Sequence, residues 1–437
     1  MDTYHVIIDK LMIQNSLQTD LDESLDLLSF KMLLYVLFLG VLPAYLVYKV
    51  KLKPLSFKET LLSKAKVLLS SLLIIVILLL SFSKFYTSFL REHKPLRYYV
   101  NPTYWIYSIG DYIALVTSKG EVEFKQLGLD AKISPPNKPH KLVIMVVGEA
   151  TRADHFSLNG YKRETNPLLK KENIVNFKNF YSCGTSTAVS VPCMFSVYDR
   201  SGYSYKKGMA VENVLDVVNH TNQVAILWRD NNSDSKGVAL RVPFEDFKYG
   251  NKNTICDDVE CRDEGMLVGL DKYIEQHKNQ DILIVLHQMG NHGPAYYKRY
   301  PKSFEKFTPI CKTNQLENCT KESIANAYDN ALLYSDYFLS KVIGLLKNYQ
   351  NEYDTTMFYI ADHGESLGEN GLYLHGMPYF IAPEAQTHVA SLMWFGKNNQ
   401  HKIDEEKIYS QDNLFHTLLG LFNVKSEVYD KKMDILK

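Results

Sequence analysis

Two long uncharged runs of residues stand near the start of the chain. The runs from Met32 to Tyr48 and from Val67 to Ser83 each hold 17 residues without Asp, Glu, Lys or Arg, and the second is rich in Leu and Ile. This length is at the short end of what spans a bilayer, and lysines bracket both runs where their ammonium groups can reach the interface. The pattern predicts two transmembrane helices, at about 32–48 and 67–83, within a membrane region of residues 31–83. Two buried core helices are the alternative.

The charges beside these runs predict the orientation of the chain. The segment 1–30 is polar, partly amphipathic and ends in an acidic cluster. Six lysines lie between the runs: Lys49, Lys51, Lys53, Lys58, Lys64 and Lys66. The positive-inside rule therefore places residues 50–65 in the cytoplasm. Segment 1–30, which lacks the pattern of a signal peptide, and everything after the second run then lie on the periplasmic side of a bacterial inner membrane.

Residues 84–139 are expected to connect the membrane region to a catalytic domain at 140–437, with a boundary at the Pro-rich stretch 134–139. In this domain short apolar, β-branched runs alternate with helical patterns, which is typical of an α/β fold with a parallel sheet covered by helices. The expected strands are Lys141–Val147, Val224–Trp228, Ile282–Leu286 and Thr356–Ile360. The expected helices are Val211–Asn219, Met266–Gln276 and about Glu322–Asn348.

Polar residues follow each expected strand directly. They are Gly148-Glu149, the run Arg229 to Gly237, the run His287 to Gly293, and Asp362-His363-Gly364-Glu365. Ligands bind at this edge of open α/β sheets. Glu149, Asp362 and His363 are residue types that bind zinc, and Thr187 or a phosphate oxygen would complete a tetrahedral set. The alternative is that each is an ordinary turn or solvated loop residue.

Small hydroxyl residues crowd the stretch from Tyr181 to Phe195, between two cysteines. Thr187 is expected at a helix N-terminus, where free N–H groups suit a phosphate. Zinc would lower the pKa of its hydroxyl and make it a nucleophile. Alternatively, Thr185 or Thr187 is only an N-cap.

Three histidines and a lysine are left for other tasks at this edge. His287, His292 and His375 would bind a second metal, hold phosphate oxygens or protonate a leaving group. Lys236 would pair with a phosphate oxygen or remain a solvated lysine.

Charge and cysteine content limit the compartment and the partners. Lys plus Arg equals Asp plus Glu, 49 against 49, so net charge gives no argument for nucleic acid, and none is expected as a partner. The six cysteines lack zinc-type spacing and allow 15 pairings. Pairing between sequence neighbours closes three small loops, which favours an oxidising compartment.

Several long stretches closely resemble the lipid A phosphoethanolamine transferases, including the mobile colistin-resistance enzymes. They are Val147–Asp154, Cys183–Phe195, Trp228–Gly237, Leu286–Pro294 and Asp362–Gly371. The resemblance runs from about Met12 to the C-terminus and implies an alkaline phosphatase/sulfatase-like α/β/α sandwich. Family members have five spans, of which this chain holds the last two. Relative to them the chain is truncated, so we expect a sound catalytic domain and weaker action on membrane lipids.

The resemblance also implies roles for single residues. It makes Thr187 the nucleophile and gives the zinc ligands as Glu149, Thr187, Asp362 and His363. It gives the phosphate or second-metal residues as Lys236, His292 and His375, with His287 beside them. It gives the lipid-proximal substrate residues as Asn15, Thr19 and Glu23, and the disulfides as Cys183–Cys193, Cys256–Cys261 and Cys311–Cys319.

The reaction that the resemblance implies is a ping-pong transfer. Phosphatidylethanolamine would give phosphoethanolamine to Thr187, and a lipid A phosphate would then accept it. The added amine masks a phosphate, so polymyxins should bind the altered membrane more weakly. The expected protein is a monomer with one Zn²⁺ and room for a second. The alternatives are transfer to the lipopolysaccharide core or other glycans, a phosphodiesterase or sulfatase, a metal-free lipid-binding protein, and an inactive fragment.

Overall fold

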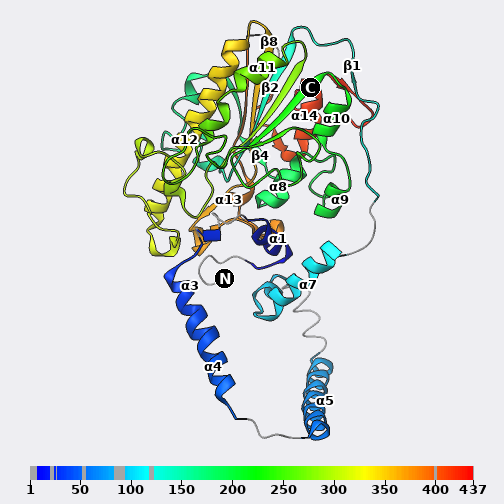
Figure 1. The fold of residues 1–437 in the computed structure, drawn as a ribbon, viewed down its shortest axis with the longest axis vertical. Coiled ribbons are helices and arrows are strands. Elements are labelled where there is room, and N and C mark those ends of the chain that lie inside the picture. Colours follow the sequence, from blue (N-terminus) through cyan, green and yellow to red (C-terminus); the bar gives the residue numbers. More distant parts are fainter. Residues whose placement is uncertain are drawn as a thin grey trace. The chain divides into compact units, whose positions relative to one another are not determined.

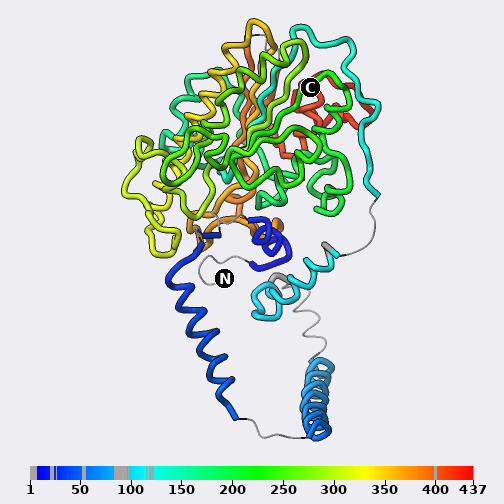
Figure 2. The backbone as a smooth tube through the Cα atoms, in the orientation of Figure 1, coloured from blue at the N-terminus to red at the C-terminus, as the bar shows by residue number. Residues whose placement is uncertain are grey.

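The computed structural model describes residues 7–19, 24–25, 27–51, 56–82, 94–117, 123–397 and 401–436. Glu23 lies outside these residues. The chain divides into two compact units, one of Met1–Asp26 with Ser108–Lys437 and one of Leu27–Tyr107 (Figures 1 and 2). The first, larger unit holds the sheet and therefore the strand ends with their polar residues.

Two apolar helical segments dominate the smaller unit. The first runs without a break from α3 (Phe30–Tyr35) through a π-helical stretch, Val36–Val41, to α4 (Leu42–Lys49). The second, α5 (Phe57–Ser81), begins with a capping box between Ser56 and Glu59. Both are long and apolar enough to cross a membrane, and neither is buried inside the protein. The prediction of two apolar helices is confirmed, and the buried-core alternative is wrong. The second helix begins ten residues earlier than predicted because its lysine-bearing N-terminal part is also helical.

The larger unit is built on a seven-stranded sheet in the order β3-β11-β8-β2-β7-β5-β6. In that order the strands are Ile174–Phe177, Ser391–Phe395, Tyr353–Ala361, His140–Gly148, Asp281–His287, Val224–Asp230 and Phe244–Asp246. Strand β11 runs antiparallel to both of its neighbours, and the other pairs are parallel. The sheet is therefore mixed, which corrects the expectation of a parallel sheet. The four predicted strands form its centre.

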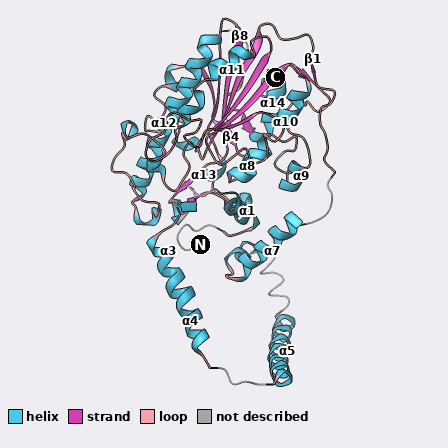
Figure 3. Cartoon of the chain, viewed as in Figure 1, coloured by secondary structure: helices cyan, strands magenta, loops and turns pink. Residues whose placement is uncertain are grey.

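Helices cover both faces of this sheet, as Figure 3 shows with α12 on one side of the strands and α10 and α14 on the other. From Thr187 onwards, the described α-helices of seven or more residues are α8 (Thr187–Met194), α10 (Val214–His220), α11 (Leu270–Gln276), α12 (Lys321–Tyr349) and α14 (Leu414–Leu421). The central strands are almost continuous runs of buried aliphatic residues, as expected where both faces are covered. The predicted α/β/α sandwich is confirmed, and its three predicted helices correspond to α10, α11 and α12.

The remaining α-helices and strands lie outside the seven-stranded sheet. The helices are α1 (Lys10–Gln18), α7 (Thr103–Thr117), α9 (Tyr205–Met209) and α13 (Glu384–Thr387). The strands are β1 (Lys132–Ile133), β4 (Asn179–Tyr181), β9 (Ser366–Leu367), β10 (Tyr373–Leu374), β12 (Ile408–Ser410) and β13 (Val424–Lys425). Disulfides join Cys183–Cys193, Cys256–Cys261 and Cys311–Cys319, so the cysteines pair with their sequence neighbours as expected.

Candidate active site

Two neighbouring strands bring three metal-type side chains together. Glu149 follows β2, and Asp362 and His363 follow β8. Because Gly148 and Ala361 are paired in register, the residues after them are neighbours in space. All three side chains have 0% exposure, and one ligand atom from each lies within 4.8 Å of the others. The carboxyl end of the sheet thus forms a compact, buried cluster of two carboxyl groups and an imidazole.

Hydrogen bonds fix how Asp362 and His363 face this cluster. His363 Nδ1 lies 2.8 Å from the carbonyl oxygen of Gly364 and donates to it, which leaves Nε2 for a ligand. Asp362 Oδ1 accepts from the N–H groups of Ala150 (3.0 Å) and His363 (2.7 Å). Its other oxygen, Oδ2, is buried and has no hydrogen-bond partner among the described residues, 3.4 Å from His363 Nε2. A cation would satisfy both atoms.

The electrostatics of the cluster agree with a cation. Burial raises the pKa of Asp362 well above its usual range, and the charge of Glu149 raises it further. Burial also opposes the charged form of Glu149, but the charge of His292 and its hydrogen bond hold the pKa of Glu149 well below the usual range. Burial, followed by the charge of His375, lowers the pKa of His363 to about 3, so this imidazole is neutral. Two adjacent buried carboxylates beside a neutral imidazole are the donor set of a metal site.

Thr187 joins the cluster as the first residue of α8. Its Oγ1 donates to Glu149 Oε2 at 3.2 Å and lies 3.3 Å from His363 Nε2. The N-cap of this helix is Ser186, and Thr185 Oγ1 donates instead to the carbonyl oxygen of Met377. The alternative that Thr185 or Thr187 is the N-cap is therefore wrong. Thr187 is the hydroxyl that faces the metal-type residues.

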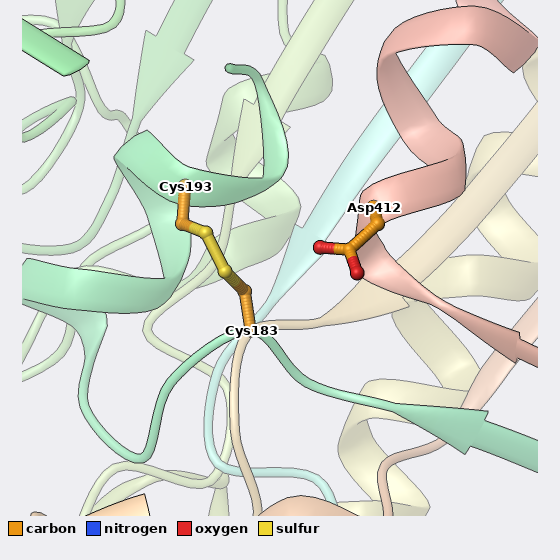
Figure 4. A group of neighbouring side chains, drawn as sticks. All are labelled: Cys183, Cys193 and Asp412. Carbon is orange, nitrogen blue, oxygen red and sulfur yellow. A yellow bond between two sulfur atoms is a disulfide. The ribbon is translucent and has the colours of Figure 1, made fainter. Parts of the chain in front are cut away.

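The loop that carries Thr187 is closed by the Cys183–Cys193 disulfide (Figure 4). Asp412 lies beside this disulfide, and the three residues together satisfy the spacing of a metal site. Both sulfurs are bonded to each other, so they offer no thiolate to a metal. The carboxylate of Asp412 accepts instead from the N–H of Arg200 at 2.8 Å.

Gln411 connects the Thr187 loop to the end of β8. Its side chain is fully buried, and its Oε1 accepts from the N–H of Cys183 at 2.7 Å. Its Nε2 donates to the carbonyl oxygens of Ala361 (2.8 Å) and Asp362 (2.7 Å). The amide of Gln411 therefore holds the loop that carries Thr187 against the end of β8, which Asp362 follows.

Two further histidines border the cluster. His292 Nδ1 lies 3.0 Å from Glu149 Oε1, and His375 Nδ1 lies 3.0 Å from Glu365 Oε2. The ring centroids of His375 and His363 are 4.2 Å apart. Glu365 also accepts from the hydroxyl of Tyr296 at 2.9 Å. His363, Glu365 and His375 form a second group with metal-type spacing.

Other residues named from the sequence lie outside this cluster. His287 is fully buried at the end of β7, and its Nδ1 is 2.8 Å from Asp230 Oδ2. Lys236 Nζ donates to the carbonyl oxygens of Ser233 (2.7 Å) and Gln18 (3.3 Å). The structure thus brings Lys236 to α1, and it keeps His287 in the core beside the cluster.

Asn15 and Thr19 lie on α1 and at its C-cap, and both are half-buried. Thr19 Oγ1 donates to the carbonyl oxygen of Asn15 at 2.7 Å. Helix α1 belongs to the larger unit and packs against α8. The expected substrate residues are therefore near the helix that begins at Thr187.

Comparison with known proteins gives the family. A family model described as Phosphoethanolamine transferase EptA/EptB matches residues 1–116, and the Sulfatase model matches residues 141–424. Phosphatidylethanolamine transferase Mcr-1 of Escherichia coli is 45% identical over 439 residues, which are 98% of this chain and 81% of the relative. The chain belongs to the phosphoethanolamine transferases. EptA of Escherichia coli (strain K12) is 42% identical over 450 residues, which are 100% of this chain and 82% of the relative.

Solved structures agree with this assignment. The integral membrane lipooligosaccharide phosphoethanolamine transferase A from Neisseria meningitidis matches with a TM-score of 0.93 and 38% identity. The match covers 100% of this chain and 83% of that protein. The resemblance inferred from the sequence is confirmed, as are the fold and the enzyme class.

Like Gln411, Asn232 of this transferase contacts the cluster and was not singled out from the sequence. Asn232 Nδ2 donates to Glu149 Oε2 at 3.0 Å and to the carbonyl oxygen of Gln288 at 2.7 Å. Asn232 lies in the polar run after β5, and this position at a strand end was the feature of the sequence that could have indicated a role in the site. A run of nine polar and small residues does not show which one turns inward.

Proposed function

We propose that this transferase moves phosphoethanolamine from phosphatidylethanolamine to a phosphate of lipid A through a phosphothreonine at Thr187. One observation carries the proposal: Thr187 Oγ1 lies within 3.3 Å of both Glu149 Oε2 and His363 Nε2, at the start of a buried helix. These two short distances support Thr187 as a nucleophile that a metal ion would activate. The names of the relatives, which include a phosphatidylethanolamine transferase and lipid A and lipooligosaccharide transferases, support the donor and the acceptor.

Zinc is the metal that suits this site. The proposed ligands are Glu149, Thr187, Asp362 and His363. The Oδ2 of Asp362, unpartnered among the described residues, and the available Nε2 of His363 fit an ion with mixed oxygen and nitrogen ligands. When bound, zinc supplies positive charge that favours the deprotonated hydroxyl and polarises the phosphoryl group. Glu365 and His375 would contribute to a second ion, while Nε2 of His363 stays on the first.

In the first half-reaction Thr187 Oγ bonds to the donor phosphorus, and the bond from phosphorus to the glycerol oxygen breaks. Diacylglycerol leaves with a proton. The N–H groups at the start of α8 face the phosphate oxygens. His292 and His375, whose Nδ1 atoms are held by Glu149 and Glu365, act on the leaving oxygen and on the phosphate.

In the second half-reaction an oxygen of a lipid A phosphate bonds to the phosphorus of phosphothreonine. The bond from phosphorus to Thr187 Oγ breaks, and the threonine hydroxyl regains its proton. The product carries an ammonium group in place of exposed phosphate charge, so polymyxins bind it less strongly. The two apolar helices would anchor the protein in the bacterial inner membrane, with the catalytic domain in the periplasm.

The test is intact-protein mass spectrometry of the full chain with phosphatidylethanolamine and zinc. We expect phosphoethanolamine on Thr187, none on Thr187→Ala, and normal labelling of Thr185→Ala as the matched hydroxyl control. Addition of lipid A should then remove the label and yield modified lipid A. Labelling of another residue in the unchanged protein would contradict the proposal.

A further inference from the structure

Ala150, the residue directly after Glu149, has an unusual backbone conformation. Its φ is 52°, in the left-handed region that glycine adopts readily and that a residue with a Cβ seldom adopts. Asparagine and aspartate can support this conformation with a local hydrogen bond from the side chain, but alanine cannot. Residues in such conformations persist only where the surrounding structure holds them, and they cluster at functional sites. The conformation of Ala150 must therefore be held by contacts from other parts of the chain.

Two side chains bond the backbone of Ala150. Its N–H donates to Asp362 Oδ1 at 3.0 Å, and its carbonyl oxygen accepts from the hydroxyl of Tyr328 at 2.6 Å. The same hydroxyl accepts from the N–H of Arg152 at 2.9 Å. The phenolic oxygen of Tyr328 thus closes the turn 150–152, because it donates to one end of the turn and accepts from the other.

The hydroxyl of Tyr328 has a well-fixed position. Tyr328 lies on α12, far from Ala150 in the sequence, and its side chain is fully buried. Its ring packs edge-on against the rings of Tyr296 and His155, with centroids 5.5 and 5.3 Å apart. The ring cannot shift without disturbing these neighbours. Helix α12 therefore supplies a rigid support for the turn that follows Glu149.

This turn orients both carboxyl groups of the metal cluster. The carbonyl oxygen of Glu149 accepts from the N–H of Asn291 at 3.1 Å, and a Cβ added to Gly290 would lie 3.1 Å from Glu149 Cβ. The backbone of Glu149 is thus closely packed and follows the turn. Asp362 Oδ1 is held by the N–H of Ala150, which leaves Oδ2 to face the cluster. A change of φ at Ala150 would release Asp362 Oδ1 and alter the direction in which Glu149 leaves the strand.

We propose that Tyr328 is a positioning residue for the metal site: its hydroxyl holds Ala150 in the left-handed conformation and thereby fixes Glu149 and Asp362 as ligands. This inference rests on the proposed metal site. The hydroxyl bonds to backbone atoms of the turn, so it acts through Ala150 and not on the metal or the substrate. A tyrosine that only filled the core would need its ring and not its hydroxyl.

The test separates the hydroxyl from the ring. Tyr328→Phe keeps the packing and loses both hydrogen bonds, so we expect the zinc affinity of the full chain to fall about tenfold. Competition with a chromogenic zinc chelator measures this affinity. Tyr334→Phe is the matched control, because Tyr334 is a buried tyrosine of the same helix whose hydroxyl has no hydrogen-bond partner among the described residues. This control should bind zinc normally.

Rescue by glycine distinguishes positioning from packing. Glycine adopts the left-handed conformation without strain, so adding Ala150→Gly to Tyr328→Phe should restore most of the lost zinc affinity. Ala150→Gly should not restore the affinity lost in Asn232→Ala, which lacks a donor to Glu149 Oε2. Unchanged zinc affinity in Tyr328→Phe, or a loss that Ala150→Gly does not restore, would overturn the inference.

Amide hydrogen exchange examines the same turn without metal. In the metal-free chain, Tyr328→Phe should speed exchange in peptides that contain residues 150–152, because the N–H of Arg152 loses its acceptor. Tyr334→Phe should exchange there like the unchanged chain. Equal exchange in the two variants would also overturn the inference. Because this measurement uses no zinc, failure of the proposed zinc chemistry would not alter its result.

Discussion

At the residue scale, the chemistry depends on side chains that are oriented by hydrogen bonds from the polar atoms that do not face the site. Asp362 and His363 each use one polar atom on the backbone and keep the other for the site. Glu149 is surrounded by donors from Thr187, Asn232 and His292. Such partners set the direction of a ligand and tune its basicity, so their loss is felt without any change in the ligand itself.

Asn232 gives a direct test of this dependence. Asn232→Ala removes the donor to Glu149 Oε2 and should reduce zinc affinity or transfer activity about ten- to a hundredfold. Zinc titration of the purified chain, with mass spectrometry of Thr187, measures both. Asn159→Ala is the matched control, because that amide bonds to Ala153 and Asn176 and not to Glu149, Asp362 or His363. Equal zinc affinity and equal labelling in Asn232→Ala would contradict the expectation.

Asp336 should make folding stability depend on pH. Its carboxylate accepts from the N–H groups of Leu168 and Leu169, yet burial raises its pKa to about 7. A carboxyl whose pKa is raised in the folded state stabilises the fold at low pH, and this contribution is lost as the pH rises towards 7.

The measurement compares the unfolding free energy of the unchanged chain with that of Asp336→Asn. From pH 5 to pH 7 the unchanged chain should lose about 2 to 3 kcal/mol of unfolding free energy relative to Asp336→Asn. A difference that stays constant over this range would show that the pKa of Asp336 is ordinary.

At the scale of elements, the sequence predicted the parts that follow a simple period and missed those that do not. The four central strands are long aliphatic runs and were found, whereas β3 and β11 were not. The antiparallel direction of β11 is set by its pairing with β8 and β3, which no local pattern encodes. In the same way, Glu149, Asp362 and His363 follow recognisable strands. Gln411 comes from a 3₁₀ turn far along the chain and gave no signal.

A substitution at Gln411 tests how far the site depends on the connection between the Thr187 loop and the end of β8. Gln411→Leu leaves the N–H of Cys183 and the carbonyl oxygens of Ala361 and Asp362 without their partner. We expect a loss of about 2 to 4 kcal/mol in unfolding free energy and slower labelling of Thr187. Gln276→Leu, at an exposed position at the end of α11, should change neither. Wild-type stability in Gln411→Leu would show that this amide is dispensable.

At the scale of the whole molecule, the charge pattern and the disulfides together allow the orientation to be measured. All six cysteines are in disulfides, so an introduced cysteine is a unique label. Lys51→Cys, between the two apolar helices, should react with a membrane-impermeant maleimide only when the cytoplasmic side is opened. Lys132→Cys, exposed on β1, should react in intact spheroplasts. The reverse pattern would contradict the predicted topology.

The position of helix α1 in the sequence also limits when this helix can dock during folding. A ribosome makes this helix more than three hundred residues before it makes Gly376, one of the residues on which the helix packs. Helix α1 therefore remains undocked while both apolar helices and most of the sheet are synthesised. Its docking closes a very long loop, and the entropy cost of this closure is offset only when the rest of the domain has folded. Helix α1 is thus translated long before the residues on which it docks.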